Sequence, residues 1–280
     1  MQLSRIQSVG EFVAKAGPFL LAHEAEHGLM LSLCMVLEQG SPLYTEPPYF
    51  AVVEQHGLVV LAALMTPPRN LLISRCDEQA ALASLAADVA SFAPPGVTGP
   101  VQSSALLAHL LQLPDQPASK AMSMRLYRLD QVAPIGPVSG AMRRAEERDL
   151  HFLVNWFPAF QAEALETHDS ARSEAQVRSF LGNPSRGLML WVDKDRPVSM
   201  TGYSHSTPTS SRVVAVYTPP EHRRRGYASA LVAAVSQQQI DAGCSFLTLY
   251  TDLANPTSNH IYQQIGFRPV ADADEWCIGA

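Results

Sequence analysis

A run of arginines between a proline pair and a glycine is the part of this sequence best suited to chemistry. Thr218-Pro219-Pro220 follows an apolar segment, and Arg223-Arg224-Arg225-Gly226-Tyr227-Ala228-Ser229 leads into a segment with helical periodicity. The first turn of a helix has N–H groups without intrahelical partners, and the helix dipole adds about half a positive charge there. A glycine lets the backbone approach a ligand closely. This segment therefore predicts a site for an anionic group such as a diphosphate.

A second motif begins after the next apolar segment. The pattern Asn-x-x-Ser-x-x-x-Tyr-x-x-x-Gly-Phe is met by Asn255, Ser258, Tyr262, Gly266 and Phe267. A tyrosine hydroxyl is a suitable proton donor for a leaving group. Two interpretations are open for two of these residues. Asn255 before a proline is also typical of a helix N-cap, and Tyr262 alone is typical of a core aromatic side chain.

Together these motifs resemble those of the GNAT superfamily of acyl-CoA-dependent N-acyltransferases. The resemblance covers about Met142 to Val270 and includes Arg144-Ala145-x-x-x-Asp149 near its start. The phrase Val216-Tyr217-Thr218-Pro219-Pro220 and a two-part layout are similar to the subgroup related to glycine N-acyltransferase. In that subgroup a degenerate N-terminal half precedes the active half.

The resemblance implies that acetyl-CoA is the co-substrate and that an acetyl group passes to an amine by direct attack. Backbone groups of Val216, Tyr217 and Thr218 would hold the pantetheine arm and polarise the thioester carbonyl. The implied diphosphate contacts are Arg223, Arg224, Arg225, Gly226, Tyr227, Ala228 and Ser229. Asn255 and Ser258 would lie at the pantetheine, and Tyr262 would be the general acid. The alternative is an acyl-CoA sensor without catalysis.

The general base is not indicated. Many relatives carry a glutamate on the fourth or fifth strand, but the segment 212–217 has none. The candidates are His205, Glu163, Glu166, Tyr250 or a water relay, although His205 is more typical of a surface turn. An amine that arrives partly neutral needs no dedicated base.

A metal site is the main competing chemistry. His23-Glu24-Ala25-Glu26-His27 fits the pattern H-E-x-x-H, in which two histidines bind zinc and the glutamate is the general base. A third ligand would have to be Glu46, which lies in the proline-rich segment 41–48. A solvated helix face explains the pattern better, so we expect no metal.

Composition limits the remaining classes of function. The chain has 280 residues, 47% of them hydrophobic, and a formal net charge of −6, which argues against general nucleic-acid binding. Its four cysteines, Cys34, Cys76, Cys244 and Cys277, lie far apart and indicate reduced core thiols. The longest apolar run, 57–65, is too short to span a bilayer. We therefore expect a cytoplasmic protein that acts on a small-molecule or peptide amine; the oligomeric state is not indicated.

A proline- and glycine-rich segment, 131–140, predicts the boundary between two domains, residues 1–135 and 141–280. The expected fold class is α/β (α+β): a mixed central sheet flanked by helices in the C-terminal part, and a first part that is a degenerate copy or an unrelated domain. The expected helices are 10–37, 80–92, 147–165 (kinked or interrupted at Pro158), 173–181, 226–242 and 256–265. The expected strands are 49–54, 58–65, 122–127, 142–145, 188–192, 197–204, 212–217 and 246–250.

One internal repeat bears on that choice. Thr66-Pro67-Pro68 follows the strand 58–65, as Thr218-Pro219-Pro220 follows the strand 212–217. Either this is a chance tripeptide in a chain with 21 prolines, or it marks a duplicated fold. In the second case the first copy has lost its phosphate loop, because Arg69-Asn70-Leu71-Leu72 contains no glycine.

Overall fold

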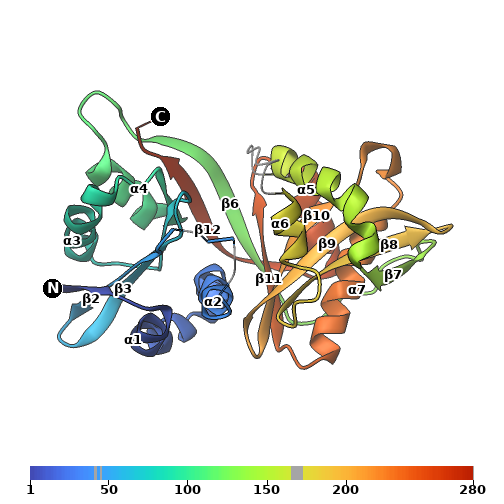
Figure 1. Ribbon diagram of the computed structural model, residues 1–280, viewed down its shortest axis with the longest axis horizontal. Coiled ribbons are helices and arrows are strands. Elements are labelled where there is room, and N and C mark those ends of the chain that lie inside the picture. The colour runs from blue at the N-terminus through green and yellow to red at the C-terminus, as the bar shows by residue number, and fades with distance from the viewer. Residues whose placement is uncertain (41–42, 45, 165–172, 280) are drawn as a thin grey trace. The chain divides into compact units, whose positions relative to one another are not determined.

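The computed structural model describes residues 1–40, 43–44, 46–164 and 173–279 (Figure 1). The chain divides into two compact units. The first comprises Met1–Leu126, Tyr250–Ala254 and the chain from Pro269 onward, and the second comprises Tyr127–Leu249 and Asn255–Arg268. The units therefore interleave along the sequence, because the last strand packs with the first unit, whereas the sequence prediction separates them at one linker.

The elements up to residue 129 include both helices and strands. They are β1 (Gln2–Ile6), α1 (Val9–Leu21), α2 (Glu24–Glu38), β2 (Tyr49–Gln55), β3 (Leu58–Met65), β4 (Leu71–Ile73), α3 (Gln79–Val89), η1 (Ala90–Phe92), β5 (Gly96–Pro100), α4 (Val101–Leu111) and β6 (Ser119–Leu129). Strands β1 to β4 pair antiparallel in order, and β4 pairs parallel with β5. The helical segment expected over 10–37 is confirmed and consists of two helices, which are separated at Ala22 and His23.

Both faces of the first unit's sheet are covered, which explains the nearly continuous apolar runs of β2 and β3. Tyr49, Ala51 and Val53 pack with helices α3 and α4. The alternate residues Phe50 and Val52 pack with helices α1 and α2. The strand period of two therefore sends neighbouring side chains into two separate cores.

The second half of the chain has the same kinds of element. They are β7 (Ala141–Arg144), η2 (Glu147–Asp149), α5 (Leu150–Ala164), α6 (Ser173–Arg178), β8 (Arg186–Asp193), β9 (Arg196–Thr207), β10 (Ser210–Tyr217), η4 (Pro220–His222), α7 (Tyr227–Asp241), β11 (Phe246–Asp252), α8 (Pro256–Ile265) and β12 (Arg268–Cys277). Helix α5 runs through Pro158, so of the kink or interruption expected there the interruption is wrong. None of the helices in the described ranges is long and apolar enough to cross a membrane.

The order of elements occurs twice. Apart from 3-10 turns, both halves read strand, two helices, three strands, helix, strand, helix, strand. In each half the fourth and fifth strands of that series, β4 and β5 or β10 and β11, pair parallel. The fold of the first half therefore repeats that of the second, as the duplication hypothesis predicts.

The repeated tripeptide does not mark this duplication. Thr66-Pro67-Pro68 follows β3, the third strand of the first copy, whereas Thr218-Pro219-Pro220 follows β10, the fourth strand of the second. The two tripeptides occupy different places in the repeat, so their likeness is a coincidence. The duplication is carried by the order of elements instead.

Each unit is completed by the last strand of the other copy. Residues Ala273–Cys277 of β12 pair antiparallel with β5 in the first unit. The end of β6, Tyr127 and Leu129, lies in the core of the second unit with Val232, Leu247 and Phe267. This exchange is what makes the two units interleave along the chain.

Asp149 anchors the start of α5. Its buried carboxylate accepts hydrogen bonds from Arg143 Nη1 at 2.6 Å, from Arg143 Nη2 at 2.7 Å and from the Glu146 amide at 2.9 Å. Burial opposes ionisation of this carboxyl, but Arg143 and the Glu146 amide favour the charged form more strongly. The pKa of Asp149 therefore lies below its ordinary value.

Replacing this carboxylate should cost stability in a pH-dependent way. We expect Asp149→Asn to lower the free energy of unfolding by about 2 kcal/mol at pH 7. The contribution is present above the ordinary aspartate pKa and is lost as the pH falls through the lowered pKa of the folded state. Urea denaturation at pH 7 and at decreasing pH measures it. Asp130→Asn, at the exposed pair with Arg128, is the control and should cost less than about 1 kcal/mol. A difference that does not shrink in acid would contradict this assignment.

Candidate active site

Strands β10 and β11 pair over only three positions. Ser210, Ser211 and Arg212 pair with Phe246, Leu247 and Thr248, and no further pair between the two strands is found among the described residues. Strand β10 nevertheless continues to Tyr217. Its carboxyl end therefore has backbone groups on the β11 side that are available to a ligand.

A bulge reshapes the same end of β10. The register against β9 shifts between Val214, opposite Gly202, and Tyr217, opposite Met200. Two residues of β10 thus face one of β9, and Ala215 adopts a left-handed φ of +51°. Bulges of this kind bend a strand and break its ladder, and they are frequent beside active sites.

Val216, Tyr217 and Thr218 lie at this bulged end, where the sequence places them. The fully buried Ser199 on β9 donates to the Tyr217 carbonyl at 3.1 Å, and its Oγ lies 2.9 Å from Thr218 Oγ1. Trp156 on α5 lies against the Tyr217 ring, with centroids 6.2 Å apart. Sequence reasoning missed Ser199 and Trp156; β9 carries several other hydroxyl side chains, so the sequence has no signal that singles out Ser199.

The segment between β10 and α7 has the geometry of an anion site. Arg224 and Gly226 adopt left-handed φ values of +61° and +79°, and Gly226 caps α7 with no side-chain hydrogen bond. The first helical bond runs from the Ala230 amide to the Gly226 carbonyl at 2.9 Å. Within the described chain, no partner is found for the backbone amides from Arg224 to Ser229. Such a row of free N–H groups at a helix start suits a phosphate group.

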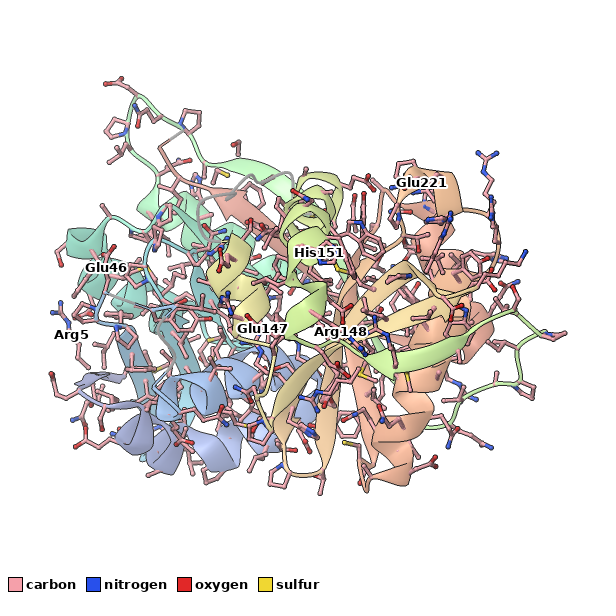
Figure 2. All side chains as sticks on the ribbon, turned by 45° about the vertical axis from the view of Figure 1, so that its right-hand side comes forward. Arg5, Glu46, Glu147, Arg148, His151 and Glu221 are labelled. Atoms are coloured by element: carbon pink, nitrogen blue, oxygen red, sulfur yellow. The ribbon has the colours of Figure 1, made fainter. Side chains whose placement is uncertain are left out.

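The side chains of this loop differ in their exposure and in their bonding partners. Arg224 and Arg225 are exposed, as is Glu221 in the preceding turn η4 (Figure 2). Arg223 is bonded to Glu163 and to the Thr218 carbonyl. Tyr227 is buried and its hydroxyl donates to Asp193 at 2.7 Å, so only its backbone amide is available to a ligand.

Asn255 is the N-cap of α8. Its side-chain oxygen accepts from the Ser258 amide at 3.0 Å, and its carbonyl accepts from the Asn259 side chain at 2.7 Å. Of the two interpretations open for Asn255, the structure shows the cap. Contact of Asn255 and Ser258 with a cofactor stays a prediction.

Tyr262 lies on α8 with its ring in the second unit's core. It is 8% exposed and packs edge-on against Phe267, with centroids 5.9 Å apart. Burial raises the pKa of the Tyr262 phenol above its ordinary value, so the hydroxyl stays protonated at neutral pH. That state is the one a general acid requires.

Residues 150–267 match the family described as acetyltransferase (GNAT) family. This part of the chain is a GNAT domain. No curated protein sequence matches the chain. The family match ends at Phe267, the last residue of the second motif.

Solved structures extend the likeness beyond the GNAT domain. A Drosophila protein is 13% identical, with a TM-score of 0.70, covering 99% of this chain and 98% of its own. A tandem GNAT protein from the clavulanic acid biosynthesis pathway is 13% identical, with a TM-score of 0.53 and 98% of both chains covered. A GCN5-related N-acetyltransferase from Kribbella flavida is 16% identical, with a TM-score of 0.56, covering 79% of this chain and 87% of its own. These likenesses show the fold, and the full-length matches indicate that the first unit has a GNAT-like fold too.

The candidate general bases lie in different parts of the structure. Glu163 lies beside the loop between β10 and α7, paired with Arg223. His205 is half-buried within β9, opposite Ser211, so the surface-turn prediction for it is wrong. Tyr250 belongs to the first unit, where its hydroxyl lies 3.5 Å from the Glu26 carbonyl. Glu166 lies outside the described residues.

His27 does not fit the zinc site considered from the sequence. His27 is buried, and its Nδ1 lies 2.9 Å from the Leu20 carbonyl. Its Nε2 accepts a hydrogen bond from the Arg75 amide at 3.2 Å. With both ring nitrogens bonded, and the pKa of His27 lowered by burial, this side chain is a neutral structural link and not a metal ligand.

The first copy lacks the glycine-containing loop that precedes α7 in the second. The equivalent segment joins β4 to α3 and reads Ser74-Arg75-Cys76-Asp77-Glu78. It has no glycine, it carries two carboxylates, and its Arg75 amide is occupied by His27. The loss predicted for the first copy is therefore supported, although the loop concerned is 74–78 and not 69–72.

Proposed function

We propose that the GNAT domain transfers an acyl group, most simply acetyl, from coenzyme A to an amine. The observation that carries the proposal is the row of unpartnered amides from Arg224 to Ser229, which begins α7 directly after the bulged end of β10. An acyl-CoA offers a diphosphate to the first feature and an extended amide-bearing arm to the second. The two-copy layout and Val216–Pro220 support a place in the subgroup related to glycine N-acyltransferase.

Direct attack needs few protein groups. The loop amides, with Arg224 and Arg225, hold the diphosphate, and the end of β10 aligns the pantetheine arm. The amine nitrogen attacks the thioester carbon, and a free amide at the end of β10 stabilises the charge that develops on the carbonyl oxygen. The carbon–sulfur bond then breaks, and Tyr262 protonates the leaving thiolate. The attacking nitrogen loses its proton to solvent or to a water relay, and no covalent enzyme intermediate forms.

A screen for thiol release tests this function. Purified protein is incubated with acetyl-CoA and a panel of polyamines, amino acids, arylalkylamines and peptides, and free thiol is followed with a chromogenic disulfide. Thiol release that requires one class of amine, with the acetylated product identified by mass spectrometry, is the expected result. Binding of acetyl-CoA without turnover on any amine would instead indicate the acyl-CoA sensor.

A further inference from the structure

Arg223 contacts three residues of the second unit, and these contacts occupy two of its three guanidinium nitrogens. Its Nη2 lies 2.7 Å and 2.8 Å from the two carboxylate oxygens of Glu163. Its Nε donates to the Thr218 carbonyl at 2.8 Å. Its guanidinium carbon lies 5.9 Å from the centroid of the Tyr217 ring. The Glu163 carboxylate therefore already offsets the charge of this guanidinium, which weakens its attraction for a second anion such as a diphosphate.

These contacts connect helix α5 to the end of β10. Glu163 lies in the last turn of α5, where a carboxylate faces the negative end of the helix dipole and gains from a nearby cation. Trp156 on the same helix packs on Tyr217. Arg223 thus joins α5 to the carbonyl of the residue that follows β10.

We propose that Arg223 and Glu163 act as a positioning pair that sets the end of β10 for the pantetheine arm, and that Arg223 is not a diphosphate ligand. The inference rests on the proposed function. Neighbouring Arg224 and Arg225 are exposed, and neither has an ion pair within the described chain, so they are the side chains available to phosphate. Arg223 thus positions the end of β10, and Arg224 and Arg225 bind the diphosphate.

Glu163→Gln distinguishes a diphosphate ligand from a positioning residue, because the two roles predict opposite changes in cofactor affinity. If Arg223 were a diphosphate ligand, removing its carboxylate partner would release it and strengthen binding, while Arg223→Gln would weaken binding. If the pair positions β10, both substitutions weaken binding of the complete cofactor. Neither should then change binding of the nucleotide half alone, adenosine 3′-phosphate 5′-diphosphate, which lacks the pantetheine arm.

Titration calorimetry with acetyl-CoA and with this nucleotide half tests the proposal on the full chain. We expect Arg223→Gln and Glu163→Gln each to weaken acetyl-CoA binding about fivefold, and the double variant no further, because the residues act as one pair. Each should bind the nucleotide half as wild type does. Arg225→Gln is the matched control and should weaken both ligands alike, about fivefold.

Three results would overturn the positioning role: tighter binding by Glu163→Gln, equal losses for both ligands in Arg223→Gln, or additive losses in the double variant. Thermal unfolding of each variant excludes a general loss of structure, which would affect both ligands. Wild-type protein that binds neither ligand would overturn the proposed function together with this inference.

Discussion

Gly226→Val should weaken binding of acetyl-CoA at least about a hundredfold, which corresponds to about 2.7 kcal/mol. Gly226 has a φ of +79°, and a Cβ there would lie 3.1 Å from Val138 Cγ2. A β-branched residue is strained in the left-handed region, so the loop must move. The amides at the start of α7 then no longer point toward one shared phosphate position. Titration calorimetry of wild type and variant measures the loss.

The other end of the same helix provides the control. Gly243 also has a left-handed φ, +106°, and a Cβ there meets nothing within 4 Å. Gly243→Val should therefore carry a similar backbone strain with no effect on the cofactor. Should Gly226→Val bind acetyl-CoA within about threefold of Gly243→Val, the phosphate-loop assignment would fail.

Tyr262→Phe should lower the rate of acyl transfer about a hundredfold and leave the affinity for acetyl-CoA unchanged. The substitution removes only the hydroxyl, so the packing of the ring against Phe267 is kept. Single-turnover thiol release, measured with the acceptor that the amine screen identifies, gives the rate. Burial raises the pKa of Tyr262, so the phenol should stay protonated near pH 10, the ordinary pKa of tyrosine. The wild-type rate should therefore not fall there through deprotonation of the general acid.

Tyr127→Phe is the matched control for the loss of a phenol. Tyr127 lies in the same core cluster as Tyr262, and its hydroxyl bonds to Asn259 at 2.9 Å and to Gln263 at 3.0 Å. Its removal should cost about 1 kcal/mol of stability and leave the rate within about twofold of wild type. A full rate for Tyr262→Phe would remove the general acid from the mechanism and leave Tyr262 as a core residue.

Local features of the site could be predicted from the sequence. The loop Arg223–Gly226 and the cap at Asn255 depend on residues within a few positions of one another, and the structure places them at the start of α7 and α8 as expected. The strand end at Tyr217 was located for the same reason. Such features are set by backbone conformation and neighbouring side chains, which a short segment contains.

Features that depend on distant residues could not be predicted. The bond between Arg223 and Glu163 joins positions 60 residues apart, and that between Ser199 and the Tyr217 carbonyl joins positions 18 apart. The exchange of β6 and β12 depends on contacts between segments that lie far apart in the sequence. The tripeptide at Thr66 is too short to indicate the duplication, which is visible only in the whole order of elements.

A crystal structure of the protein with acetyl-CoA tests the central claim most directly. The account predicts one cofactor per chain, with its diphosphate on the amides from Arg224 to Ser229, its arm along Val216–Thr218, and no cofactor on the loop 74–78. Diphosphate density on any other part of the chain, or on the loop of the first copy, would contradict it.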